Sequence, residues 1–152
     1  MVNALNVGNS ILIRSFTENI DVTPMKLQKL IYFIYRDYIQ QTGIPLFEER
    51  FETWRYGPVV PSVYAEFKKD GANAIRQYYI ENDGKTVFTV NEEGSPIFKR
   101  VIDNIWNNCK NFDGIYLSSL THREGSAWSK AVEKKSPYLS DDDIKAEVIS
   151  FG

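Results

Sequence analysis

The chain has 152 residues, a length typical of a single domain. Hydrophobic residues make up 43% of it and charged residues 25%, which argues against both a disordered chain and a membrane protein. The formal net charge of -2 gives little attraction for the phosphates of nucleic acid. No signal peptide and no run of 18 apolar residues occurs, so we expect a cytoplasmic protein.

Reactive residue types are scarce, with one Cys (Cys109) and one His (His122). One Cys cannot close an intrachain disulfide, and these two residues cannot build a four-ligand Cys/His zinc site. The sequence also lacks the G-x-S-x-G motif of serine hydrolases and the glycine-rich motifs that bind phosphate. We therefore expect no catalytic residue, no metal site and no cofactor.

Two helices are predicted at the start of the chain. The first covers roughly residues 4–18. A second begins where Thr23 can cap the free amides and Pro24 suits the first turn, and it ends at Gly43, which Pro45 follows. Its apolar residues recur at helical spacing and also occupy other faces, so we expect this helix to be central and covered on most sides.

The middle of the chain predicts a small sheet and one helix. Residues 51–56 (FETWRY) favour a strand, which Gly57 and Pro58 should stop. A helix follows from Pro61 to about Gly71. Two further strands, 77–81 and 86–90, are predicted to form a hairpin around an Asp-Gly turn.

Capping residues and apolar spacing predict four more helices. They begin at Ser95-Pro96, Asp113, Ser126 and Ser140. The first carries a single apolar stripe that includes Cys109, so we expect this Cys to be a buried small hydrophobe. The prediction is a mainly helical α+β domain of about seven helices, with a small antiparallel sheet built from the FETWRY strand and the hairpin.

Three blocks of sequence together resemble a known family. They are MKLQKLIYFIY (residues 25–35), GIPLFEERFETWRYGPVVPSVYAEFKK (residues 43–69) and LTH (residues 120–122), which Trp128 follows. The chain resembles the Panacea antitoxin domain, found in SocA-like and phage-associated GepA-like proteins, over roughly residues 5–135. Members of this family often have Pro before the Trp, where this chain has Ala127.

The resemblance implies an antitoxin of a toxin–antitoxin system, which neutralises a small protein toxin by direct contact. SocA-like members act as adaptors that deliver the bound toxin to a ClpXP-type protease, so such a protease is a second expected partner. Some relatives carry an additional helix-turn-helix domain. We expect residues 1–152 to form one Panacea domain with no room for that DNA-binding part.

Eight residues from the resembling blocks are candidates for the contact with a partner. They are Trp54, Tyr56, Gly57, Pro58, Tyr64, Thr121, His122 and Trp128. The aromatic residues either pack on the core or anchor an interface, where Trp and Tyr are favoured. The His either binds the carbonyl groups at a helix end or makes a hydrogen-bonding or pH-sensitive contact with the partner.

Three other hypotheses remain open at the level of sequence. A toxin strand could add to the edge of the small sheet along residues 77–81. The helices and hairpin could form a winged helix-turn-helix regulator, although the acidic composition argues against it. An enzyme could use the carboxylates of Glu48, Glu49 and Glu52, whose ordinary role would be to face solvent in a loop.

Overall fold

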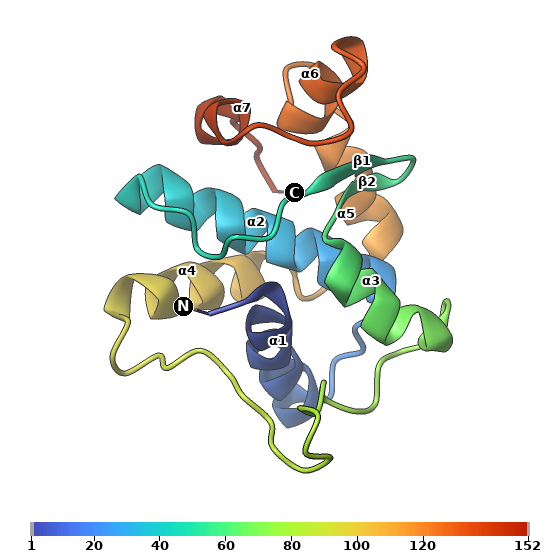
Figure 1. Cartoon of the computed structure of the whole chain (residues 1–152), viewed down its shortest axis with the longest axis vertical. Helices are drawn as coiled ribbons and strands as arrows, with labels where there is room; N and C mark the ends of the chain where they lie inside the picture. Colours follow the sequence, from blue (N-terminus) through green and yellow to red (C-terminus); the bar gives the residue numbers. More distant parts are fainter. Residues whose placement is uncertain (1, 152) are drawn as a thin grey trace.

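Helix α2 (Pro24–Thr42) lies at the centre of the molecule, and most of its residues are buried. Thr23 caps it by accepting a hydrogen bond from the Lys26 amide, and Gly43 ends it with a left-handed backbone (φ 72°). Both ends lie where the sequence predicts them. In the computed structural model of the chain, which describes residues 2–151, five of the other helices pack around α2, and the sixth, α6 (Ala127–Glu133), packs on two of those five (Figure 1).

Six more α-helices are found between residues 2 and 151, so the predicted mainly helical α+β class with about seven helices is confirmed. They are α1 (Ala4–Glu18), α3 (Pro61–Phe67), α4 (Pro96–Cys109), α5 (Gly114–Thr121), α6 (Ala127–Glu133) and α7 (Asp141–Ala146), with a 3-10 turn η1 (Lys68–Asp70) after α3. The predicted caps Asp113, Ser126 and Ser140 each accept a backbone hydrogen bond at a helix start. Cys109 is fully buried, as the apolar stripe of α4 predicts.

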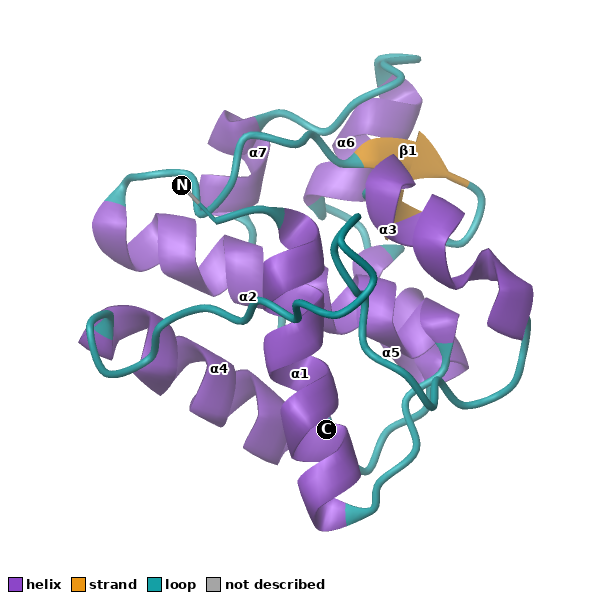
Figure 2. Cartoon of the chain, turned by 60° about the horizontal axis from the view of Figure 1, so that its bottom comes forward, coloured by secondary structure: helices purple, strands orange, loops and turns teal. Residues whose placement is uncertain are grey.

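The sheet differs from the prediction. Its two antiparallel strands are β1 (Glu52–Trp54) and β2 (Gly57–Val59), joined by a tight turn. Gly57 and Pro58 therefore do not stop the only strand of this segment: they begin the second one, because Gly57 adopts a positive φ of 112° that lets the chain reverse. In Figure 2 the strands are confined to this one hairpin.

Residues 77–90 form a loop and not the predicted pair of strands. The fully buried Asn9 of α1 donates through Nδ2 to the carbonyls of Tyr79 and Phe88 (3.0 Å each) and accepts from the Tyr79 amide (2.9 Å). One backbone hydrogen bond, from the Glu81 amide to the Thr86 carbonyl (2.8 Å), closes the tip. Because α1 satisfies backbone groups of Tyr79 and Phe88 that a ladder would use, no strand forms here, and the hypothesis of a toxin strand added along 77–81 loses the sheet edge that it requires.

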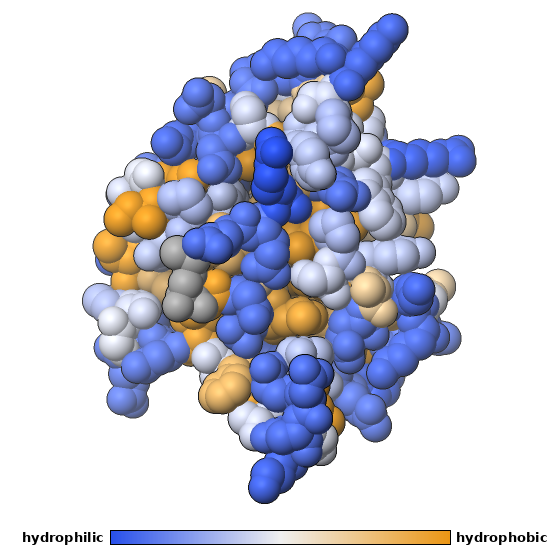
Figure 3. Space-filling model, in the orientation of Figure 1, coloured by the Kyte–Doolittle hydropathy of each residue, from blue (hydrophilic) through white to orange (hydrophobic). Residues whose placement is uncertain are grey.

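The surface is mainly polar. Figure 3 shows apolar residues exposed in separate groups on the face in view, with polar residues between them. None of the helices described is long and apolar enough to cross a membrane.

Candidate partner-binding site

The turn between β1 and β2 is held by three side chains. One comes from α5, one from the residue that follows α5, and one from α6. Three consecutive carbonyl oxygens each face one such side chain, in the pairs Trp54 with Trp128, Arg55 with His122, and Tyr56 with Ser118. The donor–acceptor distances are 2.7, 2.9 and 2.5 Å, respectively. We call Ser118, His122 and Trp128 the turn clamp. It leaves the backbone of the turn little freedom to move.

His122 is the central member of the turn clamp. Its Nε2 lies 2.9 Å from the Arg55 carbonyl and its Nδ1 lies 2.7 Å from the Ser118 carbonyl, while its ring packs against Trp128 at a centroid distance of 3.9 Å. Both carbonyl oxygens are acceptors, so each of these contacts is a hydrogen bond when the facing ring nitrogen carries a hydrogen. His122 therefore contacts a carbonyl at the end of its own helix, as one of the two sequence interpretations expects. It also contacts a carbonyl of the β1–β2 turn.

Helix α2 holds β2 from the opposite side. The Gln28 side chain pairs with the backbone of Val60, donating through Nε2 to its carbonyl (3.1 Å) and accepting from its amide (3.0 Å). The Nζ atom of Lys29 donates to the Pro58 carbonyl (3.1 Å). These side chains satisfy backbone groups of β2 and of the residue after it that a further strand would otherwise satisfy.

Gly57 is required where β2 approaches α5. A Cβ atom at this position would lie 2.5 Å from Oγ1 of Thr121 and 3.0 Å from Cε of Lys29. Thr121 is itself fully buried and donates to the Ser118 carbonyl. Gly57 and Thr121, two of the candidate residues, therefore serve close packing behind the turn.

Lys29 is a feature that the sequence analysis missed. Its side chain is 1% exposed, and its one hydrogen bond among the described residues goes to the Pro58 carbonyl. Burial lowers the pKa of Lys29 to about 7, because the charged amine loses water that no carboxylate replaces. The burial of Lys29 could have been expected from the sequence, because the residue lies within a helix that was predicted to be covered on most sides.

A cavity of about 450 Å³ lies beside the turn, between α2, α3 and η1. We call it the turn cavity. Its apolar and aromatic walls include Met25, Trp54, Tyr56, Val59, Val63 and Tyr64. Its charged lining residues are Lys29, Arg55 and Lys68, and no Asp or Glu lines it. The cavity is therefore apolar inside and positive at its edge.

The eight candidate residues divide into two groups. Tyr56 (55% exposed) and Tyr64 (45% exposed) reach solvent, and the half-buried Trp54 packs edge-to-face on Tyr64 with ring centroids 4.8 Å apart. These three line the turn cavity. The other five lie behind it: Gly57, Pro58 and Thr121 are buried, and His122 and Trp128 are half-buried members of the turn clamp.

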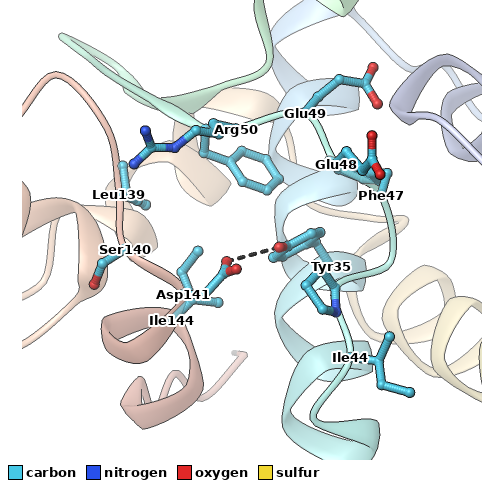
Figure 4. A pocket seen from close by; sticks show the side chains of 12 residues that line it. Tyr35, Ile44, Phe47, Glu48, Glu49, Arg50, Leu139, Ser140, Asp141 and Ile144 are labelled. Atoms are coloured by element: carbon cyan, nitrogen blue, oxygen red, sulfur yellow. Dashed lines mark hydrogen bonds between the residues drawn. The ribbon is translucent and has the colours of Figure 1, made fainter.

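A second cavity, of about 470 Å³, is lined by Glu48 and Glu49, two of the three carboxylates that the enzyme hypothesis named, whereas Glu52 does not line it (Figure 4). Glu49 accepts hydrogen bonds from the Ala4 amide (3.1 Å) and the Ser62 hydroxyl (3.1 Å), so it joins the starts of α1 and α3. Figure 4 shows Glu48 and Glu49 on one side of the cavity, away from Asp141, which accepts from the Tyr35 hydroxyl (2.8 Å). The bonded carboxylates here serve to connect chain segments.

Comparison with known proteins identifies the family. A family model described as "Antitoxin SocA-like, Panacea domain" matches residues 27–129, which is more than half of the chain. This chain belongs to the SocA-like antitoxins with a Panacea domain. The resemblance carried by the three sequence blocks is thereby confirmed.

A curated relative in this family is Antitoxin SocA of Caulobacter vibrioides (strain NA1000 / CB15N). The two are 35% identical over 82 residues, which represent 54% of this chain and 44% of that protein. The chain thus matches less than half the length of this relative. No solved structure matches the chain.

The tertiary structure brings the three sequence blocks together around the turn. The first supplies Lys29 from α2, the second supplies the β1–β2 turn, and the third supplies His122 and Trp128 of the turn clamp. All three blocks meet around the turn, and the family match spans these residues. In this chain the three blocks therefore build a supported turn beside a cavity.

Ala127, at the position where the resemblance leads us to expect Pro, makes a specific hydrogen bond in this chain. Its amide donates to Oε1 of the buried Glu147 (2.8 Å), which also accepts from the Tyr32 hydroxyl (2.9 Å). Burial raises the pKa of Glu147, even with Arg36 only 3.5 Å away. Pro has no amide N–H, so this bond between the start of α6 and the residue after α7 depends on the Ala.

Proposed function

We propose that this protein is an antitoxin that neutralises a small protein toxin in the cytoplasm by direct, non-catalytic contact. Membership of the SocA-like antitoxin family is the observation that carries the proposal. The surface proposed for the contact is the turn cavity with its rim of Trp54, Tyr56 and Tyr64. Aromatic side chains at a rigid, partly exposed site are typical anchors of protein interfaces.

The arrangement of the turn supports this choice. The turn clamp holds three backbone carbonyls, and Lys29 and Gln28 hold the strand behind them. A rigid site loses little conformational entropy on binding, so more of the contact energy appears as affinity.

Co-expression with the product of the adjacent gene tests the proposal. The wild-type chain should restore growth and co-purify with that product, whereas Tyr56→Ala combined with Tyr64→Ala should weaken both effects. A matched control is Ile115→Ala combined with Val148→Ala, which removes two exposed apolar side chains that do not line the cavity. Absence of both rescue and complex with the wild-type chain would reject the antitoxin proposal.

The same experiment separates masking from delivery to a ClpXP-type protease. We propose masking, in which the toxin level is unchanged when its activity is lost. A fall in toxin level that depends on the protease would instead support an adaptor. Nucleic acid is not expected as a partner, because the net charge is -2, and retention on DNA that weakens with added salt would contradict this.

A further inference from the structure

We propose that the turn cavity receives one apolar side chain of the toxin, flanked on the toxin by carboxylates. This inference rests on the proposed antitoxin function and specifies the chemistry of the partner segment. The occupant is a short acidic and apolar segment, of which an aromatic side chain is the preferred anchor.

The size and walls of the turn cavity fit such an anchor. Its volume of about 450 Å³ is within the range of ligand sites, and most of its lining is apolar or aromatic. Trp54 and Tyr64 already pair edge-to-face with centroids 4.8 Å apart. An aromatic ring of the toxin would extend this packing and would be removed from water when it enters the cavity.

The charges of the cavity select the flanking residues. Arg55 and Lys68 are exposed lining residues, and neither makes an ion pair within residues 2–151. The nearby Glu52 is not a lining residue, and its carboxylate accepts from the Trp54 indole (2.7 Å). The local positive charge contrasts with the net charge of -2 of the whole chain, so carboxylates are the complementary groups.

Lys29 adds to this preference from the inner wall. An amine has more N–H donors than the single bond to the Pro58 carbonyl uses. A carboxylate brought close by the toxin would favour the charged form of Lys29 and compensate part of its burial. The site is thus more favourable for an acidic partner than for a neutral or basic one.

Three tripeptides serve as probes, because they separate charge from apolar contact: Ac-Glu-Phe-Glu-NH₂, Ac-Lys-Phe-Lys-NH₂ and Ac-Glu-Ala-Glu-NH₂. Each is titrated into ¹⁵N-labelled full-length protein while the indole N–H resonance of Trp54 is followed. The first peptide should shift this resonance saturably and bind about ten-fold tighter than either of the others.

Charge reversal provides the decisive variant. Arg55→Glu combined with Lys68→Glu changes two exposed side chains and should reverse the preference toward the Lys-flanked peptide. The matched control, Lys85→Glu combined with Lys145→Glu, makes the same change of charge at exposed positions outside the cavity and should leave the preference unchanged.

Equal binding of the acidic and basic peptides, absence of any shift of Trp54, or an unchanged preference in the reversal variant would overturn the inference. A concentration-dependent shift of Trp54 without peptide, with dimers in sedimentation, would also overturn it in favour of a second copy as occupant. The growth assay keeps the two proposals apart. If the wild-type chain and the reversal variant rescue growth equally, the antitoxin function stands and the acidic anchor fails.

Discussion

Replacement of Lys29 by Met should change how stability depends on pH. The folded chain buries this amine with one carbonyl partner, and burial lowers its pKa from 10.5 to about 7. Between these two pH values the unfolded chain binds more protons than the folded chain. The free energy of unfolding contributed by Lys29 therefore rises with pH in this window, and below about pH 7 the cost of burying the charge is present in full.

The size of this effect follows from the two pKa values. Between pH 7 and pH 9 the wild-type chain should gain about 2 kcal/mol relative to Lys29→Met, in which the titrating group is absent. Above about pH 9 the buried thiol of Cys109, with its pKa raised to about 12, lowers the stability of both chains and so cancels in their difference. Burial also raises the pKa values of Tyr32 and Tyr35, with the same opposing sign at still higher pH.

Urea unfolding followed by circular dichroism at pH 7, 8 and 9 measures this difference. Lys145→Met is the matched control, because Lys145 is exposed on α7, and its pH dependence should parallel that of the wild type. If wild type and Lys29→Met show the same dependence on pH, Lys29 does not titrate in this window, and the description of it as a buried, weakly compensated amine is refuted.

Three other predictions address the support of the turn and the core. His122→Ala should lower the free energy of unfolding by about 1 kcal/mol, because the Arg55 carbonyl loses its side-chain partner while the Ser118 carbonyl keeps the Thr121 hydroxyl, and thermal unfolding should show this. Gly57→Ala should cost more than about 2 kcal/mol and Gly43→Ala about 1 kcal/mol, because both have positive φ but a Cβ atom meets a neighbour only at Gly57. Equal losses of stability in the two variants would show that backbone conformation alone, and not the contact of the Cβ atom, decides the cost at Gly57. Cys109 should resist a thiol reagent in the folded chain and react once after denaturation; fast reaction in the folded chain would contradict its burial.

Much of the helical fold could be predicted because its signals are local. A cap such as Thr23 and a stop such as Gly43 act on amides and carbonyls within one turn of their own position. The Asp-Gly turn near Gly84 was also a correct local signal, since the Asp83 carboxylate accepts from the Thr86 amide (2.8 Å). The two predicted strands beside it failed, because their pairing groups bind Asn9, a residue some 70 positions earlier in the chain.

The candidate site could be predicted only in part, because its motifs are local but the exposure of each residue is not. Sequence analysis found residues of the turn and, of the turn clamp, His122 and Trp128 but not Ser118, and it found them only as separate blocks that resemble one family. It did not distinguish Tyr56 and Tyr64, which reach solvent, from Gly57 and Thr121, which are packed behind the turn. Exposure depends on which surfaces meet, and spacing along the chain carries little information about that.

The sequence by itself thus determined the helices, their ends, the scarcity of reactive groups and the family. Each of these follows from composition, from contacts within a helical turn or from motif order. Only the tertiary structure decided that the chain carries a clamped turn, a buried Lys29 and an apolar cavity with a positive edge. These arise where side chains of α2, α5 and α6 reach carbonyl groups of a distant turn, and burial there changes the charge and accessibility of each group.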